Sequence, residues 1–132
     1  MLKPEYDTPE LQARLSKADY QVIAHEDTER PFTGQYWDTK ENGIYTCKVC
    51  GTKLFDSSTK YDSGCGWPSY FDAIGDTIET SVDSKLGVPR VEIHCKKCGT
   101  HLGHVFEDGP KDKTGLRYCV NSASILLNST QA

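Results

Sequence analysis

Two short cysteine motifs restrict what this chain can fold into more than any other feature of its 132 residues. The segment CKVCG holds Cys47 and Cys50, and the segment CKKCG holds Cys95 and Cys98. The two-residue spacer lets both sulfurs of a pair reach one tetrahedral ion, and the following glycine permits a tight turn. Because residues 51–94 separate the two pairs, we expect the tertiary fold to bring all four thiolates around one structural Zn²⁺ ion.

The sequence leaves other accounts of these cysteines open. The six cysteines could form three disulfides, but that arrangement is typical of small secreted proteins. A thioredoxin-like redox C-x-x-C needs a βαβ setting, which neither pair has in its surroundings. Iron could occupy the same four-cysteine site. We favour zinc, in a structural role, because two matched pairs are more specific than one and four thiolates leave no open position for a substrate.

Helix signals are confined to the beginning of the chain. Thr8 and Ser16 are residue types that cap helices, and Pro9 follows Thr8 at the first helical position. They predict two short helices, over about 9–15 and 17–25.

From residue 43 onward the pattern is typical of short strands separated by Gly, Asp, Ser and Pro. The runs are 44–48, 53–55, 67–71, 77–80, 88–95, 101–106 and 116–127. In RVEIH, Val91 and Ile93 alternate with polar residues, which predicts a half-buried strand. We expect a mainly β (α+β) fold and a single domain, 1–132, in which a helical layer (1–33) packs on an antiparallel, zinc-containing β domain (34–128).

The charge and hydropathy of the chain argue against some kinds of partner. A formal net charge of −4 favours neither a nucleic acid nor an anionic membrane. The sequence has no apolar run near the roughly 20 residues that cross a bilayer. Its start, MLKPEYDTPE, lacks the apolar stretch of a secretion signal, so we expect a cytoplasmic protein.

The segment RYCVNSAS contains a candidate nucleophile, Cys119. In a strand, Arg117, Cys119 and Asn121 would share the face opposite Tyr118 and Val120. A nearby cation favours the thiolate, which is the reactive form of cysteine, so we expect Arg117 to lower the pKa of Cys119. The segment alone leaves open a buried strand whose cysteine has no chemical role.

Two further segments carry groups suited to chemistry. HLGHVF holds His101 and His104, which can exchange protons near neutral pH or can be ordinary polar residues of a strand. SGCGWPSYF holds Cys65 and Trp67. Trp67 can wall a pocket or belong to the core. A second thiol on a glycine-rich loop can capture an oxidised cysteine as a disulfide.

In this order and spacing, CxxC, SGCGWPS, CxxCGTHLGHVF, DGP and RYCVNSAS resemble the type B methionine-R-sulfoxide reductases. The resemblance runs from about ERPFTGQYW to SASILL. It implies two small antiparallel sheets in a barrel-like arrangement, with the zinc site at one end and the catalytic groups in 34–128. It further implies that Cys119 attacks the sulfur of a methionine sulfoxide.

The resemblance assigns a role to each candidate residue. His104 would be the acid, and His101 and Asn121 would help to hold the sulfoxide oxygen. Trp67 would pack against the S-methyl group and Arg117 would support the thiolate. Phe106 would line the same pocket or belong to the core.

The resemblance also implies a reaction cycle and its partners. Cys119 would become a sulfenic acid, Cys65 would condense with it to a Cys65–Cys119 disulfide, and thioredoxin would reduce that bridge. The substrate would be methionine-R-sulfoxide in oxidised proteins, and we expect a monomer. One alternative from the residues is a zinc-ribbon-like module that binds a protein through Trp67 and the tyrosines. A hydrolase whose metal is held by His101 and His104 fails, because no convincing third ligand lies nearby in the sequence.

Overall fold

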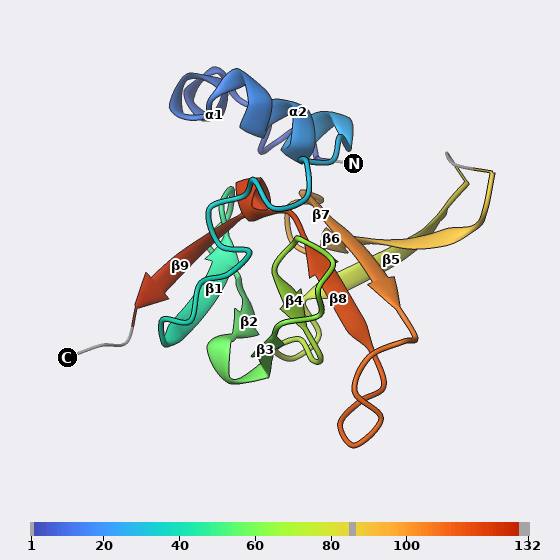
Figure 1. Cartoon of the computed structure of the whole chain (residues 1–132). Coiled ribbons are helices and arrows are strands. Elements are labelled where there is room, and N and C mark those ends of the chain that lie inside the picture. Colours follow the sequence, from blue (N-terminus) through green and yellow to red (C-terminus); the bar gives the residue numbers. More distant parts are fainter. Residues whose placement is uncertain (1, 85–86, 130–132) are drawn as a thin grey trace.

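The computed structural model describes residues 2–84 and 87–129 of the chain, which fold into two short helices and two antiparallel sheets (Figure 1). The helices are α1 (Pro9–Arg14) and α2 (Lys17–His25). The strands are β1 (Gly43–Cys47), β2 (Lys53–Asp56), β3 (Lys60–Tyr61), β4 (Ser69–Tyr70), β5 (Ile78–Asp83), β6 (Arg90–Cys95), β7 (His101–Phe106), β8 (Arg117–Val120) and β9 (Ile125–Ser129). Two 3₁₀ turns, η1 (Ser57–Thr59) and η2 (Ser122–Ser124), complete the described elements.

Both helices begin where the sequence predicts. The Thr8 side chain accepts a hydrogen bond from the N–H of Leu11, and the Ser16 side chain accepts one from the N–H of Asp19. These bonds satisfy N–H groups that the first helical turn leaves without a partner. α2 ends at His25 and is followed by Glu26, whose left-handed backbone (φ 58°) redirects the chain out of the helix. The two helices lie together on one side of the molecule, above the sheets in Figure 1.

The described strands form a three-stranded sheet, ordered β2-β1-β9, and a six-stranded sheet, ordered β3-β4-β8-β7-β6-β5. The predicted fold class, mainly β with two antiparallel sheets and short N-terminal helices, is therefore confirmed. The barrel-like description fits only loosely, because each sheet is open and ends in edge strands. Buried side chains from the helices and from both sheets form the main apolar cluster, which includes Leu11, Ile23, Tyr45, Ile93 and Leu102.

Two details of the strand predictions were wrong. The run 116–127 is not one strand: it leaves the six-stranded sheet after β8, turns through η2 and enters the three-stranded sheet as β9. In β6 the expected alternation is also incorrect, since Val91 is 38% exposed and Glu92 only 5%. Glu92 pairs in register with His104 of β7, so both side chains project from the same face of the sheet. Both are buried, so this face has polar side chains in its interior.

Among the residues that the structure describes, we find no helix with the length and apolar character needed to traverse a bilayer.

Candidate active site and metal centre

The two cysteine pairs lie at the turns of two hairpins, one in each sheet. Cys47 ends β1 and Cys95 ends β6, and each pair is followed by a glycine with positive φ, Gly51 (79°) or Gly99 (82°). The N–H of Gly51 donates to the carbonyl of Cys47, and the N–H of Gly99 donates to that of Cys95. The predicted turn is thus present at both pairs, with glycine where L side chains are disfavoured.

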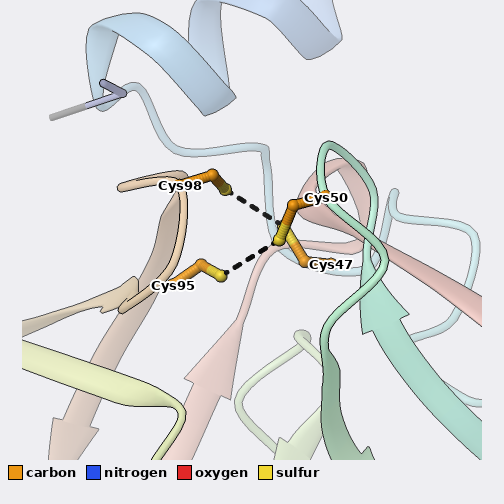
Figure 2. Close-up of side chains that lie close together, drawn as sticks. All are labelled: Cys47, Cys50, Cys95 and Cys98. Carbon is orange, nitrogen blue, oxygen red and sulfur yellow. Dashed lines mark hydrogen bonds between the residues drawn. The ribbon is translucent and has the colours of Figure 1, made fainter. Parts of the chain in front are cut away.

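The four sulfurs converge between the hairpins, as Figure 2 shows. Sγ of Cys47 lies 3.5 Å from Sγ of Cys98, and Sγ of Cys50 lies 3.5 Å from Sγ of Cys95. Thiolates at about 2.3 Å from a tetrahedral Zn²⁺ ion are about 3.8 Å from one another, so this spacing fits such an ion. All four sulfurs lie within 4.8 Å of one another. A threonine hydroxyl lies 3.0 or 2.9 Å from one sulfur of each pair. The cluster is therefore suited to hold a metal ion.

Strand register places Cys119 in a row of polar side chains across the six-stranded sheet. Cys119 of β8 pairs with Ser69 of β4 on one side and with His104 of β7 on the other. His104 pairs in turn with Glu92 of β6. Residues paired across antiparallel strands project from the same face. The register therefore places the thiol of Cys119 beside the imidazole of His104. The sequence alone does not indicate this contact, because 14 residues (105–118) separate the two.

A cavity of about 200 Å³ opens beside this row. Its wall contains every predicted residue outside the metal cluster except His101, together with Thr28, Arg90, Gly103 and Val120. The predicted residues in the wall are Cys65, Trp67, His104, Phe106, Arg117, Cys119 and Asn121. A depression of about 270 Å³ is lined by other residues (37–41, 57 and 60–62), and one of about 530 Å³ shares Trp67, Arg90 and His104 with this cavity, so size alone does not select the site. The convergence of two thiols, an imidazole and a guanidinium marks the smaller cavity as the candidate active site.

The two half-buried thiols of the cavity are in contact. Sγ of Cys65 lies 3.5 Å from Sγ of Cys119. The hydrogen bond with Cys119 lowers the pKa of Cys65 to about 4, and the hydroxyls of Ser63 (3.0 Å) and Ser69 (3.3 Å) act in the same direction. The same contact, together with burial and the charge of Cys65, raises the pKa of Cys119. The contact therefore links the ionisation of the two thiols: it favours the thiolate at Cys65 and opposes it at Cys119.

Arg117 does not dominate the pKa of Cys119 as expected. Its charge does act to lower that pKa, but the contact with Cys65 outweighs it. Nε and Nη2 of Arg117 donate to the carboxylate of Asp108 at 2.9 and 3.2 Å, and its guanidinium carbon lies 4.4 Å from the centre of the Phe106 ring. The physical reason for the difference is that the contact with Cys65 and burial both raise this pKa by more than the charge of Arg117 lowers it.

The two predicted histidines occupy different positions. His104 is buried in the cavity wall, with Nε2 3.0 Å from Oδ2 of Asp83, and the same oxygen accepts from Nη2 of Arg90 at 3.0 Å. His101 lies behind it, with the two ring centres 5.9 Å apart. Its ring is 5.6 Å from that of His94. Only His104 is therefore placed to reach a molecule in the cavity.

The indole and the amide of the cavity wall are both fixed by hydrogen bonds. Nε1 of Trp67 donates to the carbonyl of Glu29 at 3.0 Å. Nδ2 of buried Asn121 donates to the carbonyl of Leu102 at 3.2 Å, and its Oδ1 accepts from the N–H of Glu29 at 3.1 Å. Both side chains thus keep one orientation at the edge of the cavity.

Two polar residues of the cavity wall, Thr28 and Arg90, were missed from the sequence, as was Asp83, which holds His104. Asp83 and Arg90 close the β5–β6 hairpin and lie opposite each other in register. The predicted runs 77–80 and 88–95 do not end at these two residues, so the strand predictions carried no signal for this pair. Thr28 precedes the segment ERPFTGQYW, whose position against the site depends on the tertiary fold.

Comparisons with known proteins identify the family of this chain. Residues 15–129 match the SelR domain family. A relative from Burkholderia thailandensis, called peptide methionine sulfoxide reductase MsrB, is 59% identical over 120 residues, covering 90% of this chain and 84% of the relative. One of the same name from Burkholderia lata is 56% identical over 126 residues, covering 95% of this chain and 88% of the relative. The resemblance drawn from the sequence motifs is confirmed. The chain belongs to the SelR domain family, that of the MsrB peptide methionine sulfoxide reductases.

Proposed function

We propose that this protein reduces methionine-R-sulfoxide in oxidised proteins to methionine, with Cys119 as the nucleophile. The observation that supports this most is the cavity in which two thiols 3.5 Å apart meet an imidazole and an indole. One thiol can take the oxygen of a sulfoxide, and the second can return the first to a disulfide. The names of the relatives give the substrate class, and the R epimer is taken from the family resemblance.

In the first step, Cys119 passes its proton to the Cys65 sulfur 3.5 Å away, and the resulting Cys119 thiolate attacks the sulfoxide sulfur while the oxygen gains protons. His104 is the proton donor that we assign, since it lies in the cavity wall opposite Cys119 and is oriented by Asp83. Asn121 holds the oxygen and Trp67 packs against the S-methyl group. Phe106 lines the pocket beside Arg117, which favours the thiolate. His101 supports His104 from behind and does not meet the substrate.

This step transfers one oxygen and two electrons. The substrate sulfur loses its oxygen and is reduced to the thioether of methionine. The Cys119 sulfur gains that oxygen as a hydroxyl and becomes a sulfenic acid. Once methionine has left, the thiol at Cys65 attacks this sulfur, a Cys65–Cys119 bond forms and the hydroxyl leaves as water. An approach of about 1.5 Å brings the two sulfurs from contact to bonding distance.

The remaining parts of the proposal concern metal, reductant and cell biology. The four-cysteine cluster would hold one Zn²⁺ ion, which joins the two hairpins and supplies stability rather than chemistry. An external dithiol, thioredoxin, would reduce the disulfide. We further propose that the protein acts as a monomer in the cytoplasm.

The test offers both sulfoxide epimers, free and within a peptide, with either dithiothreitol or thioredoxin as reductant. We expect loss of the R epimer only. Cys119→Ser should abolish turnover while metal content and thermal stability persist. Cys65→Ser should keep turnover with dithiothreitol and lose it with thioredoxin. Mass spectrometry after one equivalent of substrate, without reductant, should show the loss of two hydrogens from the protein. A protein-binding module would consume neither epimer and keep its mass.

A further inference from the structure

Residues 26–30 form a strap without regular secondary structure that leads from α2 past the candidate active site. The proposed reaction assigns no part to this strap, yet Glu29 of the strap contacts two groups to which that reaction gives substrate contacts. Its carbonyl accepts from Nε1 of Trp67 at 3.0 Å. Its N–H donates to Oδ1 of Asn121 at 3.1 Å. The backbone of one residue therefore orients both the indole and the amide.

The side chain of Glu29 fixes the strap to the chain that follows Asn121. Its Oε1 accepts from the N–H of Ser122 at 2.6 Å, and its Oε2 accepts from the N–H of Ala123 at 3.3 Å. These N–H groups begin η2, where the chain crosses from β8 to β9. Burial raises the pKa of this carboxyl, while the two backbone N–H groups act in the opposite direction. A partly buried carboxylate held by two N–H groups is an anchor of defined geometry.

The space around this carboxylate is closely fitted. A Cβ built on Gly34 would collide with Oε1 of Glu29 and with the side chain of Ser122. Gly34 has no positive φ, so alanine at this position is disfavoured by the contact and not by the backbone. Gly34 therefore leaves the space in which the Glu29 carboxylate lies against η2.

We propose that Glu29 is a positioning residue, whose carboxylate holds the strap so that its backbone orients Trp67 and Asn121 toward the substrate. The inference rests on the proposed function, because it acts through two residues to which that function gives substrate contacts. Without the carboxylate, the strap loses its bonds to η2, and both side chains lose a fixed partner. Misplacement of substrate-contacting groups by about 1 Å costs up to a hundredfold in rate.

The experiment compares three variants with the parent in steady-state reduction of methionine-R-sulfoxide. Glu29→Ala should lower kcat/KM by about tenfold to a hundredfold. Glu29→Gln keeps the size and one acceptor oxygen, so its loss should be smaller. Gly34→Ala should lower kcat/KM while the carboxylate remains in the chain. Glu10→Gln, an exposed glutamate of α1, is the matched control and should match the parent.

A second readout separates positioning from a purely structural role. The indole N–H of Trp67 gives a resolved ¹⁵N–¹H resonance, which Trp37→Phe assigns because the chain has two tryptophans. In Glu29→Ala and Gly34→Ala this resonance should move and its hydrogen exchange should quicken. A structural role alone would lower the melting temperature but leave the resonance and the kcat/KM of the folded protein unchanged.

Parental kcat/KM together with an unmoved Trp67 resonance in Glu29→Gln and Glu29→Ala would overturn the proposal. If the alanine variant does not fold, the glutamine and Gly34→Ala variants decide the matter. If the parent reduces neither epimer, the proposed function fails by itself. The Trp67 resonance then still decides whether the carboxylate positions this side chain.

Discussion

Replacing Cys65 by alanine should lower the pKa of Cys119 and make that thiol more reactive at a given pH. In the parent, the hydrogen bond with Cys65 is the largest influence that raises this pKa, and the charge of Cys65 adds to it. The variant removes both influences. Arg117 remains and acts to lower the pKa, while burial still opposes it. The net direction in the variant is therefore downward.

The size of the effect follows from the 3.5 Å between the two sulfurs. At an effective dielectric constant of about 20, two unit charges at this separation repel by about 5 kcal/mol, or about 3 to 4 pKa units. In the parent, Cys65 ionises first, with a pKa of about 4, so Cys119 would lose its proton against that charge. Without Cys65, we expect the pKa of Cys119 to fall by about 3 units.

The assay is the rate of alkylation of Cys119 by iodoacetamide between pH 5 and pH 10, followed by peptide mass spectrometry. The pH midpoint of that rate reports the thiolate. Cys119→Ala is the reciprocal variant, and it should raise the pKa of Cys65, whose largest lowering influence is the contact with Cys119. A Cys119 midpoint that moves by less than about one unit on loss of Cys65, or that moves upward, would refute the reasoning.

Three further predictions concern metal, strand spacing and a helix cap. Cys50→Ser should abolish cooperative thermal unfolding, because a structural zinc contributes about 10–16 kcal/mol, as much as a domain's net stability of about 5–15 kcal/mol. Calorimetry together with metal analysis checks this. A metal-free protein that keeps the parental transition would contradict it. Gly103→Ala should lower the free energy of unfolding, measured in urea, by about 2–4 kcal/mol. The reason is that its Cβ would collide with the carbonyl oxygen of Cys119 and push β7 away from β8. A decrease below about 0.5 kcal/mol would contradict this close approach. Ser16→Ala should cost about 1 kcal/mol, because the N–H of Asp19 loses its cap at 3.1 Å, with sulfoxide reduction unchanged.

Features set by neighbouring residues could be predicted from the sequence. The helix caps at Thr8 and Ser16 depend on contacts three residues away, and both are present. The turns at Cys47 and Cys95 need only the C-x-x-C-G pattern, and each has its glycine at positive φ. The ordered motifs further gave the family, because their combination is far more specific than any one of them.

Features set by register between strands could not be predicted in this way. Glu92 is buried because β6 pairs it with His104, and no property of RVEIH alone contains that pairing. His101 points away from the cavity for a similar reason: it pairs with His94 beyond an irregularity that shifts the β6–β7 register. The pKa of Cys119 depends on a contact with Cys65, 54 positions away, which the sequence offered only through the family resemblance.

The metal cluster and the candidate active site are linked through the strands that they share. The β6–β7 hairpin carries one cysteine pair at its turn and His104 farther along β7, and β8 brings Cys119 beside that histidine. The β1–β2 hairpin carries the other pair, so a bound ion would join the two sheets at one point. The chain itself joins them at a second point, η2, which directly follows Asn121 and is held by Glu29. Because β7 and β8 belong to the same sheet, their own hydrogen bonds fix the thiol against the imidazole. A bound ion would stabilise the pair of sheets, whereas the strap and η2, as we propose, orient the groups at the rim of the cavity.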